Sequence, residues 1–166
     1  MGTRERRDRS VKFDRDLSSL FSQAVSSKNF ENLKISLAAV GGYGRGELSP
    51  GSDIDITIIH EDRKKVDFQE FVNNFLYPLW NNGISVDYSI RTVSEALQVA
   101  KNDLRVLLGA LDCRHIAGDR RLTDELRVKN LKIWRDGAPR FFPKLLQSIN
   151  ERTSQSGRLA YLLEPD

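Results

Sequence analysis

The stretch AVGGYGRGELSPGSDIDITII, residues 39–59, constrains the fold more than any other part of the chain. It overlaps the end of the short apolar run LKISLAAV, residues 33–40, which is typical of a buried strand and stops at Gly41 and Gly42. Apolar and polar residues then alternate in DIDITIIH, residues 53–60, which indicates a second strand. The stretch therefore predicts two strands joined by a glycine-rich loop.

Two aspartates, Asp53 and Asp55, stand one residue apart at the start of this second strand. Side chains at positions i and i+2 of a strand project to the same side, so the two carboxylates are expected to lie together. Adjacent carboxylates repel each other, and burying them without a cation is costly. Such an oxygen-only pair suits a hard divalent cation, above all Mg²⁺, and two-metal sites of this kind serve phosphoryl and nucleotidyl transfer.

The glycine-rich loop predicts a phosphate site beside these carboxylates. Glycine allows backbone to approach a ligand closely, and successive N–H groups at Gly41 and Gly42 can bind phosphate oxygens. Arg45 either contacts phosphate or holds the loop to a carboxylate such as Glu47, and Ser52 either binds a phosphate oxygen or shapes the turn. The loop contains neither a Gly-x-Gly-x-x-Gly nor a Gly-Lys-Ser/Thr motif. The alternative is a glycine-rich turn between strands that carry surface aspartates.

A third carboxylate, Asp87, lies in the alternating segment ISVDYSIR, residues 84–91, which indicates a third strand. If this strand neighbours the one with Asp53 and Asp55, about 4.8 Å away, Asp87 completes a cluster of three carboxylates. Its expected role is then to bind the catalytic metal and to help deprotonate an incoming hydroxyl group. The alternative is a solvent-facing aspartate paired with Arg91 or Lys101.

Elsewhere the spacing of apolar residues predicts helices. Helices are expected over residues 11–25 and 66–80, and a further helix is expected to begin at a cap at Thr92. Most of the chain after Asp103 is also expected to be helical, with breaks near Gly118, Gly137 and Pro139. The order helix, strand, strand, helix, strand and further helices indicates an α+β fold, in which helices pack on a small mixed sheet and a helical extension follows.

Composition limits the other possibilities. Cys113 is the single cysteine, so an intrachain disulfide is impossible, and the two histidines, His60 and His115, stand far apart in the sequence. Four arginines fall within the first nine residues, which predicts a disordered basic tail over residues 1–10. The net charge is only +3, so no strongly basic face for nucleic acid is expected. We expect a cytoplasmic protein without a membrane partner, because no apolar run reaches the length of a membrane span and the N-terminus is polar.

The glycine pair followed eleven residues later by Asp53-Ile54-Asp55 resembles the signature of the DNA polymerase β-type nucleotidyltransferase superfamily. The longer string VGGYGRGELSPGSDID closely resembles the N-terminal catalytic domain of bacterial PII-protein uridylyltransferase/uridylyl-removing enzymes, and SIRT and the final YLLEPD also match. The resemblance implies a nucleotidyltransferase core over residues 11–112 and a helical extension over residues 113–166. It also implies truncation, because full-length relatives continue with an HD phosphohydrolase domain and ACT sensor domains.

The resemblance implies transfer of UMP from UTP to a tyrosine of the PII signal-transduction protein, with release of pyrophosphate. ATP stays open as the nucleotide donor. Other members of the superfamily, such as a glutamine-synthetase adenylyltransferase or a small-molecule nucleotidyltransferase, are alternatives, as is a catalytically silent nucleotide-binding module. The expected site comprises two Mg²⁺ ions held by three aspartates and a nucleotide held by the loop; these residues are Asp53, Asp55 and Asp87 for the metal and Gly41, Gly42, Arg45 and Ser52 for the nucleotide.

Overall fold

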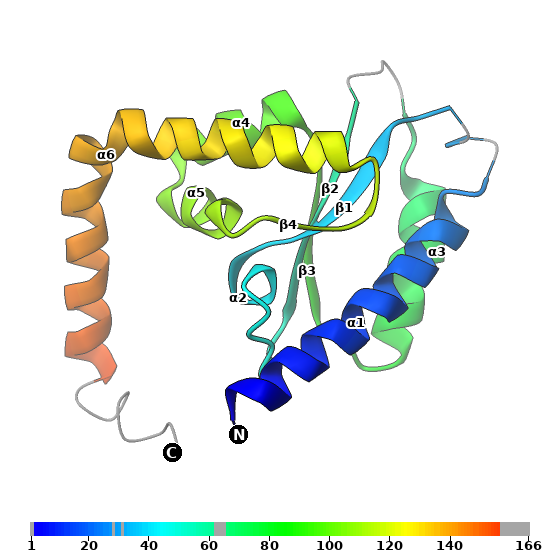
Figure 1. The fold of residues 1–166 in the computed structure, drawn as a ribbon, viewed down its shortest axis with the longest axis horizontal. Coiled ribbons are helices and arrows are strands. Elements are labelled where there is room, and N and C mark those ends of the chain that lie inside the picture. Colours follow the sequence, from blue (N-terminus) through cyan, green and yellow to red (C-terminus); the bar gives the residue numbers. More distant parts are fainter. Residues whose placement is uncertain (1, 28, 31, 62–65, 157–166) are drawn as a thin grey trace.

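The computed structural model describes residues 2–27, 29–30, 32–61 and 66–156. Its centre is a four-stranded sheet in the order β3-β2-β1-β4 (Figure 1). Strand β1 runs antiparallel to both of its neighbours, β2 and β4, whereas β2 and β3 run parallel. The strands are β1 (Ile35–Ala39), β2 (Ile54–His60), β3 (Val86–Thr92) and β4 (Arg114–Gly118).

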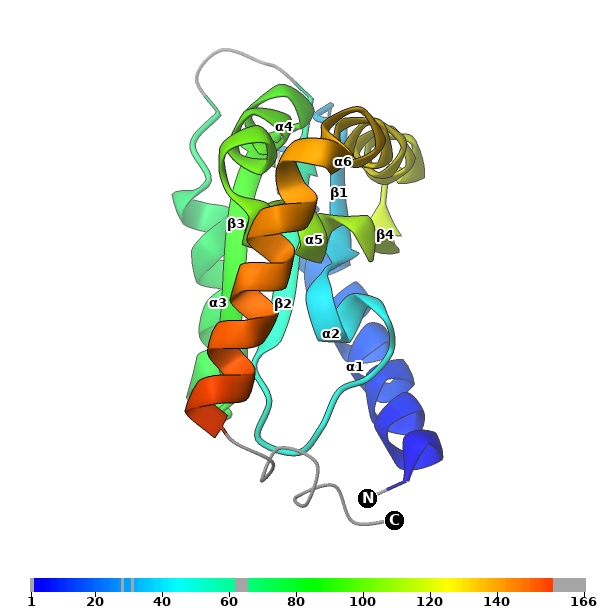
Figure 2. The ribbon, with the colours of Figure 1, turned by 90° about the vertical axis from the view of Figure 1, so that its left-hand side faces the viewer.

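Helices cover both faces of the sheet (Figures 1 and 2). One face packs against two helices. On the other side lie three helices that follow β3, of which the first and third pack on the sheet and the second packs on these two helices. The short helix α2 connects β1 to β2. The helices are α1 (Thr3–Ala24) and α3 (Gln69–Asn81) on the first face, α4 (Val93–Asn102), α5 (Leu104–Leu111) and α6 (Arg120–Ser156) on the second, and α2 (Gly41–Gly44) in the connection. This mixed sheet with packed helices confirms the expected α+β class.

Alternation along β2 decides what each face of the sheet carries. Ile54, Ile56 and Ile58 are buried in the cluster beneath α1 and α3, where phenylalanines of these helices meet edge to face. Ile59 is buried on the opposite face, in the cluster beneath α4 and α6. Because alternate residues share a face, Asp55 also points toward the side of α4, α5 and α6. The three isoleucines fix this orientation, since a slip of one residue would bury the carboxylate in the aromatic core.

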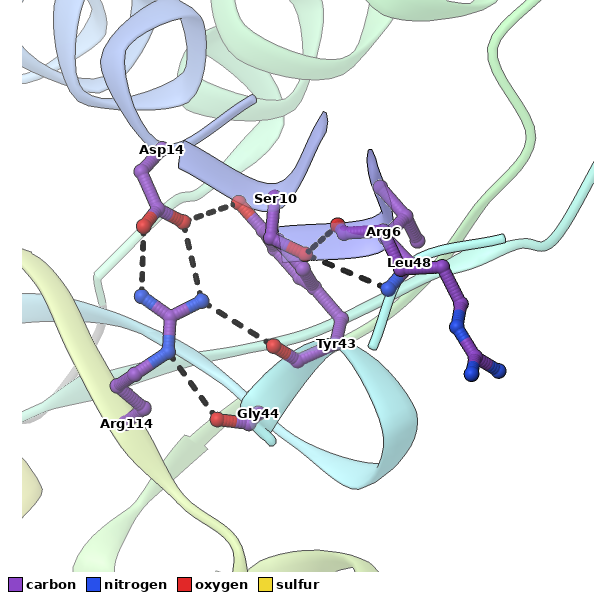
Figure 3. Close-up of polar contacts among 7 residues, drawn as sticks. All are labelled: Arg6, Ser10, Asp14, Tyr43, Gly44, Leu48 and Arg114. Carbon is purple, nitrogen blue, oxygen red and sulfur yellow. Dashed lines mark hydrogen bonds and ion pairs between the residues drawn. The ribbon is translucent and has the colours of Figure 1, made fainter. Parts of the chain in front are cut away.

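The expected disordered tail over residues 1–10 is wrong, because Thr3–Ser10 forms the first turns of α1. Ser10 is only 2% exposed, and its hydroxyl donates to the carbonyl of Arg6 at 3.0 Å and accepts the backbone N–H of Leu48 at 3.3 Å (Figure 3). Arg4 and Arg7 are exposed, whereas the guanidinium of Arg9 lies over the ring of Phe13, 5.4 Å from its centroid. The arginine-rich composition of this segment gave no sign that Ser10 is buried and anchors the helix.

The expected boundary after residue 112 is also wrong, because β4 is part of the sheet and Cys113, just before it, is 3% exposed. The helical extension begins at α6, after β4 ends at Gly118 with a φ of 83°. Helix α6 continues through Gly137 and Pro139. The expected break there takes the form of a sharp bend between the yellow first half of α6 and its orange second half (Figure 1), as is usual near proline.

None of the helices within the described residues is long and apolar enough to cross a membrane.

Candidate active site

A cavity of about 440 Å³ lies between strands β2 and β3 of the sheet and the three helices that follow β3. Asp55 and Asp87 line it together with Gly41. In the parallel ladder of β2 and β3, Asp55 is the direct partner of Asp87, so both carboxylates rise from the same face of the sheet. The expectation that Asp87 stands on the neighbouring strand is confirmed. The cavity thus brings together Gly41 of the loop and two aspartates from two neighbouring strands.

The electrostatics of Asp55 reflect this crowding. Its side chain is half-buried, and this burial raises the pKa of Asp55; the charges of Asp87 and then Asp53 raise this pKa further. Asp87 is exposed, and within the described part of the chain it forms no ion pair with Arg91 or Lys101. Among the described residues, no cationic side chain is therefore bonded to either of the two facing carboxylates in the cavity.

Asp53 lies immediately before β2, is exposed and does not line the cavity. Among the described residues, no group of three or more His, Cys, Asp and Glu side chains is already arranged to hold a metal ion. The donor chemistry of the aspartates nevertheless fits Mg²⁺, because all the donors are carboxylate oxygens. A divalent cation would also offset the mutual repulsion that raises the pKa of Asp55.

The glycines of the loop meet two different requirements. Gly41 has a φ of 58°, and a Cβ placed there would lie 3.2 Å from Oδ2 of Asp55, so the loop backbone passes close beside the carboxylate. Gly44 has no such φ, but a Cβ on it would collide with the backbone carbonyl oxygen of Asp112 at the end of α5. Gly41 therefore shapes the site, whereas Gly44 allows α2 to pack against α5.

The other nucleotide-binding candidates lie outside this cavity. Arg45 donates from Nε to Glu47 at 2.8 Å and from Nη1 to Asp112 at 2.7 Å, which is the loop-holding arrangement rather than a free phosphate ligand. Arg45 lines an adjacent cavity of about 460 Å³, which also reaches Gly41. Ser52 is exposed in the turn before β2, and neither Ser52 nor Gly42 lines either of these two cavities.

A polar network holds the loop from the side opposite the cavity (Figure 3). Arg114 of β4 donates to both carboxylate oxygens of Asp14 in α1, at 2.7 and 3.1 Å, and to the carbonyl oxygens of Tyr43 and Gly44, each at 3.1 Å. The Tyr43 hydroxyl donates to Asp14 at 2.6 Å. Tyr43 is 1% exposed, and burial raises the pKa of Tyr43 well above its ordinary value, with the hydrogen bond to Asp14 adding to the effect.

Sequence reasoning missed several residues of the site. Thr57 and Ser89 line the cavity and share a hydrogen bond of 3.1 Å between their hydroxyls. Each stands two residues after Asp55 or Asp87 on its strand, so strand alternation would have found them. Arg105 of α5 and Asn130 of α6 also line the cavity, but nothing local in the sequence signals them. The network of Asp14 and Arg114 joins residues 100 positions apart and carries no local signal either.

Comparison with known families decides what kind of domain this is. The model of the family described as "Nucleotidyltransferase domain" matches residues 19–105, a segment that contains the glycine loop, Asp55 and Asp87. The chain belongs to the nucleotidyltransferase domain family. The matched segment ends before β4, so the strand that supports the loop from behind lies outside it.

Among curated proteins, the bifunctional uridylyltransferase/uridylyl-removing enzyme of Streptomyces coelicolor is 45% identical over 150 residues, which is 90% of this nucleotidyltransferase chain and 18% of that protein. The enzyme of the same name from Mycobacterium tuberculosis is 39% identical over 130 residues, 78% of this chain and 16% of that protein. These matches confirm the expected resemblance. The chain spans less than a fifth of the length of these relatives.

Among solved structures, a chain from a toxin–antitoxin crystal structure with AMP-PNP aligns at a TM-score of 0.48 and 16% identity, over 80% of this chain and 97% of that one. Nothing about the present nucleotidyltransferase domain follows from a likeness this weak.

Proposed function

We propose that this domain transfers UMP from UTP to a tyrosine of the nitrogen-regulatory PII protein and releases pyrophosphate. The observation that carries the proposal is the facing pair of Asp55 and Asp87 in a cavity that the glycine loop also borders. Two carboxylates beside a glycine-rich backbone are what a nucleoside triphosphate with Mg²⁺ requires. The names of the relatives support uridylyl as the transferred group.

Each candidate residue has a separate role in this proposal. Asp55 and Asp87, with Asp53 beside them, would hold Mg²⁺ through carboxylate oxygens. Two bound Mg²⁺ ions would neutralise the departing pyrophosphate and make the attacking hydroxyl more acidic. Gly41 and Gly42 would bind oxygens of the β- and γ-phosphates through backbone N–H groups.

The transfer itself is an in-line displacement at the α-phosphorus. The tyrosine oxygen of the acceptor forms a bond to the α-phosphorus while the bond from that phosphorus to the pyrophosphate oxygen breaks. The proton of the tyrosine hydroxyl moves to Asp87, which is exposed and faces the cavity. Arg45 is held by Glu47 and Asp112 and acts here by fixing the loop. Ser52 stays a candidate ligand for a phosphate oxygen at the open side of the turn.

Calorimetry with UTP, ATP, CTP and GTP, with and without Mg²⁺, tests the binding step. We expect UTP to bind most tightly and only in the presence of Mg²⁺, because the aspartates repel the phosphates when no cation is present. Equal binding of all four nucleotides regardless of Mg²⁺ would contradict the proposed site. Tightest binding of ATP would instead indicate transfer of AMP.

The variant Asp87→Asn tests the chemical step, with labelled UTP and PII as substrates. We expect transfer to fall at least roughly 100-fold, the scale for losing one preorganised electrostatic contact. Asp16→Asn is the matched control, because Asp16 is exposed on α1, on the opposite face of the sheet. Transfer by Asp87→Asn within a few-fold of the Asp16→Asn control would remove Asp87 from the catalytic residues.

A further inference from the structure

Asn130, in the first half of α6, is an exception among the buried side chains of the described residues. Its side chain is 0% exposed, and neither Nδ2 nor Oδ1 has a hydrogen-bond partner within the described part of the chain. A buried amide is normally paired, because removing it from water without replacing its hydrogen bonds costs free energy. This amide therefore requires an explanation.

The same helix satisfies its other buried polar side chain. Thr123, two turns earlier, is 1% exposed, and its hydroxyl lies 2.7 Å from Oγ of Ser36 and 3.2 Å from Nδ1 of His115. These groups bond to one another. The packing of α6 on the sheet thus provides partners where a polar group is structural, which makes the lack of partners at Asn130 informative.

Asn130 lines the same cavity as Gly41, Asp55 and Asp87. The helix side of the cavity also carries apolar residues: Leu126 is one turn earlier on α6, and Ala96 and Val106 come from α4 and α5, where Arg105 lines the cavity as well. The carboxylates belong to the sheet side of the cavity and the amide to the helix side. The cavity therefore combines a charged region, an apolar wall and one amide whose hydrogen-bonding atoms are unused.

A nucleobase has the chemistry that this combination requires. Its two flat faces are apolar enough to lie against aliphatic side chains, and its edge presents a hydrogen-bond donor next to an acceptor. A side-chain amide offers one acceptor and one donor group side by side, so it can pair with such an edge through two hydrogen bonds. For uracil, Oδ1 would accept from N3–H and Nδ2 would donate to O4.

We propose that Asn130 binds the nucleobase of the nucleoside triphosphate whose phosphates lie at the glycine and aspartate end of the cavity. This inference rests on the proposed nucleotidyl transfer and identifies the residue that contacts the base. The carboxamide is planar and can turn over, so Asn130 contributes affinity for a base edge, while the shape of the apolar wall contributes the choice between bases.

The test uses Asn130→Leu, which keeps the size of the side chain and removes both hydrogen-bonding groups. Asn74→Leu is the control, since Asn74 is an exposed residue of α3 on the other face of the sheet. Calorimetry with Mg²⁺ compares UTP with inorganic tripolyphosphate, which has the phosphates without the base. We expect Asn130→Leu to weaken UTP binding roughly tenfold or more. Tripolyphosphate binding and the melting temperature of the free protein should not fall.

Equal loss of UTP and tripolyphosphate affinity, or a lower melting temperature with unchanged UTP affinity, would indicate a structural role and overturn the inference. Equal affinity of the unmodified protein for UTP and tripolyphosphate would also overturn it while leaving the phosphate site intact. Failure of the unmodified protein to bind either ligand would overturn the proposed function and this inference with it.

A second variant, Asn130→Asp, tests the hydrogen-bond pattern directly. A carboxylate accepts hydrogen bonds only, so it loses the donor that would reach O4 of uracil or N3 of cytosine. We expect the affinities for UTP and CTP to fall by a larger factor than the affinity for tripolyphosphate. An equal fall for all three ligands would count against contact between Asn130 and the base edge.

Discussion

The network behind the glycine loop allows one stability prediction to be worked out from the structure. In Arg114→Lys, the ammonium group keeps the positive charge but loses the planar fork of the guanidinium. Arg114 makes four hydrogen bonds, two to Asp14 and one each to the carbonyls of Tyr43 and Gly44. A single ammonium at the end of a lysine can keep the contact with Asp14, but it cannot reach both backbone carbonyls at the same time.

The expected cost follows from the contacts that are lost. Two hydrogen bonds to backbone carbonyls contribute roughly 1–3 kcal/mol together. The second bond to Asp14 adds at most about 1 kcal/mol, because the side chains of Arg114 and Asp14 are 34% and 27% exposed and solvent screens the pair. We therefore expect a loss of about 1–4 kcal/mol in the free energy of unfolding, which lowers the melting temperature of a chain of this size by about 2–16 °C.

Urea unfolding, followed by the fluorescence of Trp80 and Trp134, measures this loss, provided that the slope with urea concentration stays the same in both proteins. Arg121→Lys is the matched control. Arg121 also pairs with an aspartate, Asp119, but its side chain is 80% exposed, so we expect no measurable change. If Arg114→Lys loses no more stability than Arg121→Lys, the network does not hold the loop in the way described.

Two further predictions concern titratable groups. The folded-state pKa of Asp55 is raised above its ordinary value of 3.8. At pH values above about 4, the folded metal-free protein therefore binds more protons than the unfolded chain, and its stability should fall as the pH rises toward neutrality. Asp55→Asn should remove this component and raise the melting temperature at pH 7 without Mg²⁺, and an unchanged melting curve would contradict the assigned effect of burial and of the neighbouring carboxylates on Asp55. Burial raises the pKa of the Cys113 thiol to about 12, so an aromatic disulfide reagent at pH 8 should label Cys113 slowly in the folded protein and at once in urea. Rapid labelling of the folded protein would show that the thiol is accessible.

The elements that sequence predicted well are those whose pattern is local. The alternation of Ile54, Ile56 and Ile58 with polar residues identified β2 and the face on which Asp55 lies. The capping box at Thr92, where its hydroxyl accepts from the backbone N–H of Glu95, marked the start of α4. The pairing of Asp55 with Asp87 followed once β3 was assumed to neighbour β2, and helix α3 provides the crossover that parallel strands require.

The elements that sequence failed to predict depend on distant partners. Strand β4 is short and begins with Arg114 and His115, which do not resemble an apolar strand; it forms because the edge of β1 needs a partner. The N-terminal turns of α1 have an arginine-rich composition, and only the contact of Ser10 with Leu48 shows why they are ordered. Asn130 looks like any polar residue of a helix until its burial is known.

Two separate packing requirements explain the glycine-rich composition of the loop. Gly41 keeps the backbone beside Asp55, and Gly44 lets the same loop pack against Asp112. Tyr43 stands between them and is fixed by the hydrogen bond from its hydroxyl to Asp14. Because the loop is held by α1 and β4 on one side and by α5 on the other, its N–H groups stay in place before a ligand arrives. The phosphate-binding role that we propose for the loop would benefit from such support, since donors that must first be ordered lose part of their binding free energy.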